Sequence, residues 1–177
     1  MNAIKNAKIY ILILAIVLAF TQSKAEIKIA FIEMETLINE SLAGKSMIQQ
    51  LDKLNKENVK KFSEKRKKLN SEKDKIQSQK NILSKEEYEK KVINLNNEFE
   101  KVQKDANTKG NDLRTKRNNA MKKIMEELNV VLSEYSKKNN LAFIIDQKNI
   151  VIGRTDLNIT KDILELLDQK IKKIKLN

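Results

Sequence analysis

The longest pattern in the chain is a charged run over residues 45–140 in which apolar residues recur at helical spacing. No proline interrupts the run, and Gly110 is its only glycine. Apolar intervals of three and four alternate from Tyr88 to Ala106, which is typical of a helix that packs along a seam. In the first half the apolar position recurs only once in seven residues from Phe62, so the predicted seam is thin.

A signal for the start of a new helix lies in the middle of this run. Ser84 is followed three residues later by Glu87, which predicts a capping box and a new helix. The preceding helix is expected to end near Ile82, and such a short connection favours antiparallel neighbours. The run therefore predicts a helical hairpin over residues 45–139 with its tip at about 81–85. The alternative is one continuous dimeric coiled coil that passes straight through the capping box.

The segments on either side of the hairpin predict a small mixed body, formed by residues 26–44 and 140–177. Residues 27–34 have the alternation of a strand, and residues 35–41 that of a short helix. The apolar runs 141–145 and 150–153, separated by a polar turn, predict a β-hairpin. The final helix is expected from about Lys161, with Thr160 as its N-cap. Its predicted apolar stripe comprises Ile163, Leu166, Leu167, Ile171 and Ile174, and its basic C-terminal end comprises Lys170, Lys172, Lys173 and Lys175.

This body is too small to be stable alone. Three short strands are close to the lower limit for a stable sheet, and a compact part of fewer than about 60 residues is marginal. We therefore expect the strands of several copies to join into one sheet or barrel. The predicted fold class is α+β, with a long antiparallel helical hairpin that projects from a small β body shared between subunits.

Residues 1–25 have the pattern of a cleaved signal peptide. Lys5 and Lys8 precede an unbroken apolar run over residues 9–20, and Ser23 and Ala25 are small residues at the positions that a signal peptidase recognises. The apolar run is shorter than the roughly 20 residues that span a bilayer. The sequence predicts export, with cleavage after Ala25.

Composition narrows the possible chemistry. The chain has 177 residues, with 36 Lys or Arg, 24 Asp or Glu, a net charge of +12, and no Cys, His, Pro or Trp. Zinc, haem and iron–sulfur sites, disulfides and Ser-His-Asp catalysis all need residue types that are missing. We expect no catalytic residue, metal or cofactor. Lys, Asn and Ile all have A/T-rich codons, so the basic charge alone does not predict nucleic-acid binding.

The order of these features resembles the Skp/OmpH family of periplasmic chaperones of Gram-negative bacteria. The resemblance rests on the strand at 28–32, the long charged hairpin, the run at 141–146 and the segment at 156–164. It implies a homotrimer with a barrel-like β body and three helical tentacles around a cavity. In that cavity, unfolded outer-membrane proteins would be held in the periplasm without ATP before membrane insertion.

Candidate contact residues follow from this resemblance. The arm's larger apolar side chains are expected to touch the client, and they are Phe62, Tyr88, Phe99, Met121 and Met125. The alternative is that apolar arm residues form the hairpin's own seam, as expected for Leu69, Val92, Leu95 and Leu128. Gly110, inside the second helix, is a candidate hinge because glycine weakens a helix interior.

A basic cluster is formed by Arg114, Lys116 and Arg117. The resemblance implies a lipopolysaccharide site in this part of the arm, and an anionic membrane surface is a related partner. The alternative is an ordinary solvated helix face.

Two other classes of function remain open from the sequence. A structural coiled-coil protein of the envelope is one, although the thin seam and the missing lipid-anchor cysteine disfavour it. A nucleic-acid-binding protein is the other, although aromatic stacking residues are scarce and the export signal opposes it. Nucleic acid is therefore not an expected partner.

Overall fold

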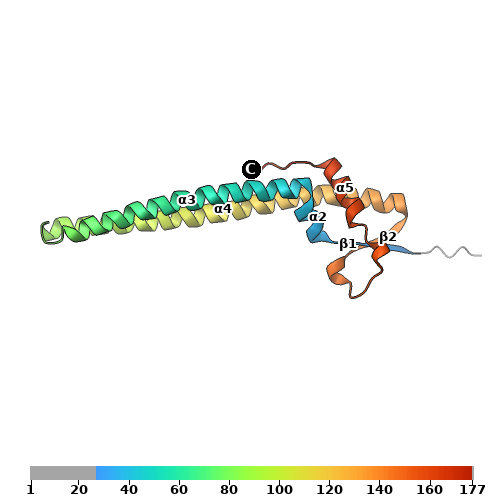
Figure 1. The fold of residues 1–177 in the computed structure, drawn as a ribbon, viewed down its shortest axis with the longest axis horizontal. Coiled ribbons are helices and arrows are strands. Elements are labelled where there is room, and N and C mark those ends of the chain that lie inside the picture. The colour runs from blue at the N-terminus through green and yellow to red at the C-terminus, as the bar shows by residue number, and fades with distance from the viewer. Residues whose placement is uncertain (1–26, 177) are drawn as a thin grey trace, which may run out of the picture.

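The computed structural model describes residues 27–176 as a long helical arm with a small body at one end (Figure 1). The elements are β1 (Lys28–Ile32), α2 (Met34–Glu40), α3 (Leu42–Ser78), α4 (Lys85–Asn139), β2 (Leu141–Asp146), the 3-10 turns η1 (Gln147–Asn149) and η2 (Thr155–Leu157), and α5 (Thr160–Lys170). The predicted signal peptide lies outside the described residues. Within residues 27–176, no helix is both long and apolar enough to span a bilayer.

The arm consists of α3 and α4, which run antiparallel over the length of α3 (Figure 1). The predicted capping box is present, since the Ser84 hydroxyl accepts the Glu87 N–H at 3.3 Å and the Glu87 carboxylate accepts the Ser84 N–H at 3.2 Å. The first helix ends at Ser78, slightly before the expected Ile82. The predicted fold-back is confirmed, and the continuous rod is wrong.

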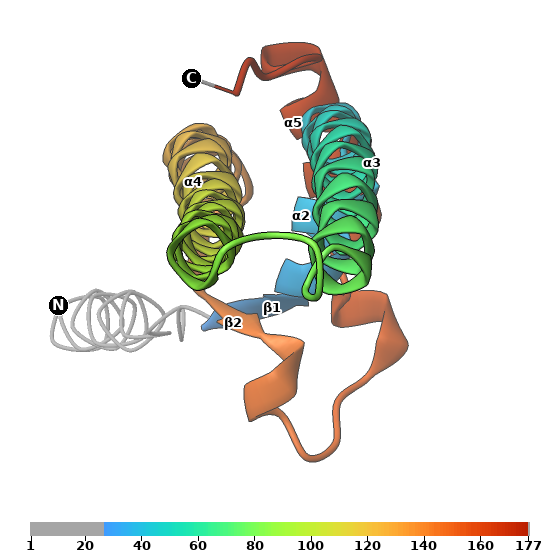
Figure 2. The same cartoon turned by 90° about the vertical axis from the view of Figure 1, so that its left-hand side faces the viewer.

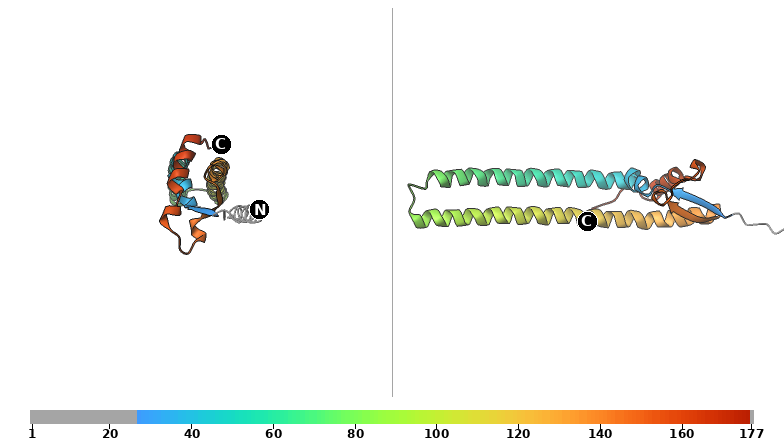
Figure 3. Two further views of the ribbon diagram at one scale, coloured as in Figure 1. Left: turned by 90° about the vertical axis from the view of Figure 1, so that its right-hand side faces the viewer. Right: turned by 90° about the horizontal axis from the view of Figure 1, so that it is seen from below.

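The two arm helices differ in length. Their 37 and 55 residues correspond to ~55 Å and ~82 Å at the helical rise of about 1.5 Å per residue. In the view from below, α4 continues past the start of α3 and lies beside the body (Figure 3). The last turns of α4 therefore belong to the body's core, while the rest forms the arm.

The seam between the arm helices is thin, as the heptad pattern predicts. Between residues 48 and 119, only Ile76, Leu95 and Val102 are buried. Polar contacts across the seam are also few; they include Lys65 Nζ with Asp105 Oδ2 at 3.9 Å and a hydrogen bond from Arg66 to Gln103. Much of the apolar surface on the arm is consequently left half-buried or exposed.

The body is closed by a parallel pair of strands. Ile29 lies opposite Phe143 in β1 and β2, and Ile32 lies opposite Asp146. Viewed along the arm, the strands lie on one side of the arm's base and α5 on the other (Figure 2). The largest fully buried apolar side chains of the core are Leu37, Met47, Ile124, Leu128, Ile163 and Leu167. These six bring α2, α3, α4 and α5 together.

The predicted β-hairpin after the arm is wrong. Residues 150–153 contain no strand, and β2 pairs with the distant β1 instead. The Asp146 carboxylate accepts the Lys148 N–H at 3.3 Å, and the Ile150 N–H donates to the Gln147 carbonyl at 2.9 Å. These bonds form the turn η1, which carries the chain away from β2. Val151 and Ile152 are left uncovered, with Ile152 91% exposed.

The end of the last helix also differs from its prediction. Helix α5 stops at Lys170, and the chain from Ile171 onward is an extended segment that runs back beside the arm (Figure 1). Ile174 is buried there, and its carbonyl accepts a hydrogen bond from Gln50 Nε2 at 2.7 Å. The apolar residue Ile174, whose spacing predicts a longer helix, is thus buried in an extended segment of chain instead.

Thr160 does not occupy the expected N-cap position of α5; Ile159 does, without a side-chain cap. Thr160 is the first helical residue, and its N–H donates to the Asn158 side-chain oxygen at 2.9 Å. The Thr160 hydroxyl instead accepts the Glu33 N–H at 2.9 Å. This bond ties α5 to the segment between β1 and α2.

Candidate functional site

An open hollow of about 1050 Å³ lies at the elbow where the arm meets the body. Its walls come from α2, α3, α4 and the turn after β2. Apolar side chains from three elements line it, including Met34, Met47, Leu51, Leu113 and Met121. Met47 is buried and supports the floor, whereas Ile48 beside it is 45% exposed.

The elbow keeps its angle because of a close backbone approach. A Cβ atom on Gly44 would overlap the carbonyl oxygen of Ile38, so only glycine fits where α3 crosses the end of α2. Ser41 caps α3 at the same place, and its hydroxyl accepts the Gly44 N–H at 3.1 Å. The local sequence thus fixes how α2 meets the arm.

The rim of the elbow hollow is charged. On the arm side, Arg114 and Arg117 are exposed and form no ion pair within residues 27–176. On the body side, Asp146 is already neutralised by Lys148 at 2.9 Å. The hydrogen bond from the Lys148 side chain holds the pKa of Asp146 below its usual range, so this carboxylate stays ionised.

The elbow hollow continues along the arm. A second hollow of about 510 Å³ shares Asn55 and Leu113 with the first, and a third of about 430 Å³ shares Arg66 and Asn70 with the second. Together they form one channel on one face of the hairpin, which we call the arm furrow. Its walls come from residues 47–70 of α3 and 99–121 of α4.

The structure places three of the predicted client-contact residues in the arm furrow and two outside it. Phe62, Phe99 and Met121 all line the arm furrow. Met125 packs against the body's core, and Tyr88 lies half-buried near the tip, outside the three hollows. Among the expected seam residues, Leu95 is buried on the arm and Leu128 in the body's core, whereas Leu69 and Val92 are half-buried.

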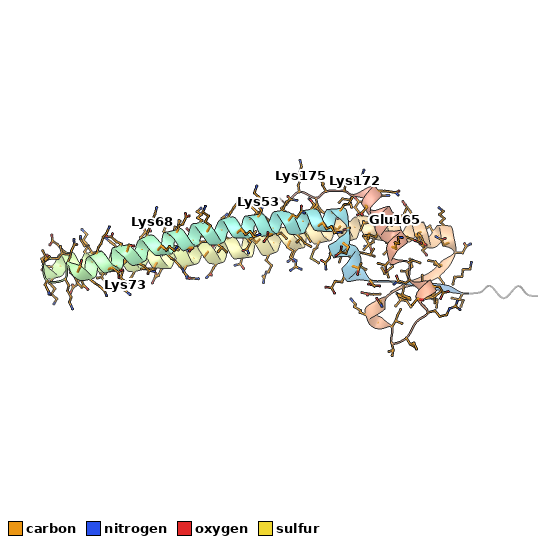
Figure 4. All side chains as sticks on the ribbon, in the orientation of Figure 1. Lys53, Lys68, Lys73, Glu165, Lys172 and Lys175 are labelled. Atoms are coloured by element: carbon orange, nitrogen blue, oxygen red, sulfur yellow. The ribbon has the colours of Figure 1, made fainter. Side chains whose placement is uncertain are left out.

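The predicted basic cluster does not form a single patch. Arg114 and Arg117 face the arm furrow, but Lys116 lies on another side of α4 because residues two apart differ by about 200°. Lys116 Nζ lies 3.9 Å from Asp112 Oδ1. Further lysines, including Lys53, Lys68 and Lys73, cover the rest of the arm (Figure 4). Basic charge is therefore spread along the arm, with two unpaired arginines at the elbow.

Gly110, the candidate hinge, lies in an unbroken stretch of α4 that also borders the furrow. A Cβ atom at this position would meet nothing within 4 Å. Gly110 lines the middle hollow together with Phe62 and Leu113, and its missing side chain leaves open space there.

The elbow itself was not predicted from the sequence. The signal was present, since Met47, Ile48 and Leu51 give α3 more apolar surface than one seam requires. The described residues contain no group of three potential ligands that could hold a metal ion. The apolar lining of the elbow hollow, together with Arg114 and Arg117, suits it to binding apolar and acidic groups through shallow contacts.

Comparison with known proteins agrees with the resemblance seen in the sequence. The model of the outer membrane protein (OmpH-like) family matches residues 28–167. A solved structure of a candidate outer membrane chaperone (OmpH-like) from Caulobacter crescentus CB15 has the same fold, with a TM-score of 0.80 and 16% identity over 89% of this chain and 93% of that chain. No curated protein matches the chain. The family model covers most of the sequence, and the chain belongs to the OmpH-like family of outer membrane proteins.

Proposed function

We propose that this chain is an ATP-independent periplasmic holdase that binds unfolded outer-membrane proteins and prevents their aggregation before membrane insertion. Its membership of the OmpH-like family and the fold it shares with the Caulobacter crescentus protein support this proposal. The functional unit is a homotrimer of chains cleaved after Ala25, in which residues 26–44 and 140–177 form the shared body. Residues 45–139 form the arms around the client, apart from the last turns of α4, which pack in the body's core.

The observation that carries the proposal is the uncovered apolar surface of the body. Phe143 is 60% exposed and Ile152 91% exposed, and Ile29 and Val151 are also exposed. Within residues 27–176 the sheet has two strands, fewer than an independently stable sheet requires, and open strand edges invite pairing with other chains. Association through the body would leave the arms projecting together around a common space.

Binding without catalysis fits the arm. A holdase stabilises the unfolded client by mass action, which requires many weak contacts and no energy source. The furrow offers exposed and half-buried apolar side chains between lysines and arginines. Cleavage after Ala25 removes three lysines and lowers the net charge from +12 to +9. This positive charge would attract acidic clients and speed their capture, more strongly at low salt.

Lipopolysaccharide or an anionic membrane surface is a second proposed ligand. The unpaired Arg114 and Arg117 are the side chains best placed to contact its anionic groups, and Lys116 would contribute less because it is paired with Asp112. Unchanged lipopolysaccharide affinity after Arg114→Ala and Arg117→Ala would exclude this site. A structural spacer is disfavoured, because the hairpin returns both arm helices to the same body.

The test combines assembly with client protection. The chain from residue 26 onward is sedimented at micromolar concentration, and a urea-unfolded outer-membrane β-barrel protein is diluted into it while light scattering is recorded. We expect a trimer and suppressed scattering at about one trimer per client, with and without ATP. A monomer that leaves the scattering unchanged would overturn the proposal.

A further inference from the structure

The arm furrow has the dimensions of a track for an extended peptide. Along α3 it runs from Met47 to Asn70, which corresponds to ~35 Å at about 1.5 Å per residue. An extended chain covers that distance with roughly ten residues at about 3.3 Å each. The track is open to one side throughout, so a chain can enter sideways without threading.

The furrow contains apolar surface that the hairpin itself does not use. None of the three buried residues of the arm's seam, namely Ile76, Leu95 and Val102, lines the furrow. The furrow instead exposes Ile48 and Val59, the latter 61% exposed. Methionines at the elbow adapt to side chains of different shape. This surface is therefore available to apolar side chains of varied sequence.

The charges of the furrow select the kind of segment that fits. Every charged residue that lines the middle hollow is basic, namely Arg66, Lys67 and Lys109. Lys109 has an acidic neighbour outside the hollow, Asp112, at 4.0 Å. The arm wall of the elbow adds Arg114 and Arg117, which have no acidic partner within the described residues.

Asp52, the acidic residue from α3 at the elbow, is already paired with Lys56 at 2.6 Å. The other acidic lining residues are Glu33, Glu35 and the Lys148-paired Asp146 on the body side of the elbow and Glu100 in the third hollow. The basic excess therefore lies in the middle hollow and on the arm wall of the elbow.

A second copy of this chain fits the furrow poorly. Its most exposed apolar segment is the loop around Val151 and Ile152. The nearest carboxylates in that loop are Asp146 and Asp156, and both are occupied, by Lys148 and Arg154 respectively. The loop therefore has no free acid for the arginines and lysines of the furrow.

From these observations we propose that the arm furrow binds an extended client segment of about ten residues. Apolar side chains of the segment lie over the floor, and acidic side chains pair with the arginines and lysines of the walls. This inference rests on the proposed holdase function and adds a location and a sequence preference to it. Unfolded segments that alternate apolar and acidic residues are the preferred ligands.

The test fills the furrow and compares it with a matched site. Gly110→Phe places a large ring in the open floor, whereas Thr108→Phe adds the same ring on an exposed position of α4 outside the furrow. The probe is a fluorescent ten-residue peptide of alternating Leu and Glu, measured by anisotropy. We expect Gly110→Phe to weaken binding about tenfold or more and Thr108→Phe to change it by less than about twofold.

Reversing the charge of the furrow provides a second test that does not depend on packing. Arg114→Glu with Arg117→Glu should weaken the Leu–Glu peptide about tenfold and strengthen a Leu–Lys peptide, because both side chains are exposed and unpaired. Circular dichroism checks that every variant keeps its helices. Equal peptide affinity in Gly110→Phe and Thr108→Phe, or no effect of the charge reversal, would overturn the proposal.

The same proteins are assayed for suppression of client aggregation, which separates the two proposals. If the wild type suppresses aggregation but the furrow variants bind the peptide normally, the furrow proposal fails and the holdase function stands. If the peptide binds in the furrow but the wild type fails to suppress aggregation, the holdase function fails. A change of oligomeric state in Gly110→Phe alone would assign the furrow to a second copy and overturn the proposal.

Discussion

At the scale of single residues, two helical glycines of this chain have opposite surroundings. Gly44 begins the arm at a point where a Cβ atom would overlap the Ile38 carbonyl oxygen. Gly110 lies in the middle of α4 with open space where its side chain would be. Both weaken their helices intrinsically, but only Gly44 is required by a contact.

These surroundings predict opposite effects for the same substitution. Gly110→Ala should raise the free energy of unfolding by up to about 1 kcal/mol, because alanine favours the helix and meets no neighbour. Gly44→Ala should lower it by about 1–3 kcal/mol, because backbone has to move. Urea unfolding followed by circular dichroism measures both. Equal changes of the same sign would contradict the contrast.

A separate measurement tests the hinge proposed at Gly110. Gly110→Ala should narrow the distribution of distances between spin labels placed at the tip and at the body. An unchanged distribution would exclude a hinge, while leaving the stability prediction intact.

Tyr135 predicts how stability falls in alkali. Partial burial, together with the hydrogen bond that its hydroxyl donates to Asp162 at 2.7 Å, raises the pKa of Tyr135 to about 12, from an ordinary value of 10.0. Between these values the folded chain retains a proton that the unfolded chain has lost. The free energy of unfolding must therefore decrease as the pH rises from about 10 towards 12.

Urea titrations at pH 8, 10 and 11 measure this loss against the variant Tyr135→Phe, which has no such proton. We expect the wild type to lose more stability than the variant across this interval. Parallel losses would show that other groups cause the alkaline instability.

At the scale of elements, the capping box decides where the arm turns. The Ser84 hydroxyl, followed by the Ser84 N–H, lowers the pKa of the Glu87 carboxyl, which stays ionised at neutral pH. Ionised Glu87 and its neighbour Glu86 also suit the positive N-terminal end of α4. The turn between the helices is thereby fixed by side chains rather than by proline or glycine.

Removing the cap should loosen the tip. Ser84→Ala should cost about 1 kcal/mol of stability, whereas Ser71→Ala, in the exposed interior of α3, should cost nothing. Because the pKa of Glu87 is lowered, its stabilising contribution is present at neutral pH and is lost as the pH falls through the acid range. Hydrogen exchange at residues 79–88 measures the local effect, and equal exchange in both variants would contradict it.

The sequence predicted the arm well because its determinants are local. A capping box, helical spacing and the missing proline all act within a few residues of each other. The second strand at 150–153 and the end of α5 were predicted wrongly because their determinants are distant. Ile174 has helical spacing but is buried by the return of the chain toward Gln50, and β2 has its partner in β1 at the other end of the chain.

The elbow was missed for a related reason. Its side chains are ordinary apolar residues in three elements, and only their meeting makes a hollow. Phe62, Phe99 and Met121 were chosen by size and type, and they line the furrow, but nothing local separated them from Tyr88 and Met125.

At the scale of the whole molecule, the two most exposed apolar side chains lie on the body, whereas basic charge is spread along the arm. Lysines project along the arm, and Lys172 and Lys175 extend the charge over the C-terminal segment (Figure 4). The most exposed apolar side chains of the body, Val151 and Ile152, lie on the turn region below the strands. This polarity favours contact between bodies and repulsion between arms.

Charge introduced into the body should therefore prevent assembly. Val151→Asp with Ile152→Asp should raise the dissociation constant of the assembly about tenfold or more, because each subunit contact would bury two carboxylates. Ile82→Asp, at the arm's tip and 82% exposed, is the matched control and should leave assembly unchanged. Analytical ultracentrifugation measures both, and equal behaviour of the two variants would place the subunit contact elsewhere.

The parallel pairing of β1 and β2 has a consequence for the order of folding. The arm forms from contacts between neighbouring segments, but the bond that joins Glu33 to Thr160 spans 127 residues. Local contacts form fast, whereas closing such a long loop is slow. A chain that crosses a membrane from its amino end would complete its helices early, while its first strand waits for a partner made last. Such a chain would pass through a state in which the arm is folded and the body is not, and the proposed subunit association would have to wait for the body.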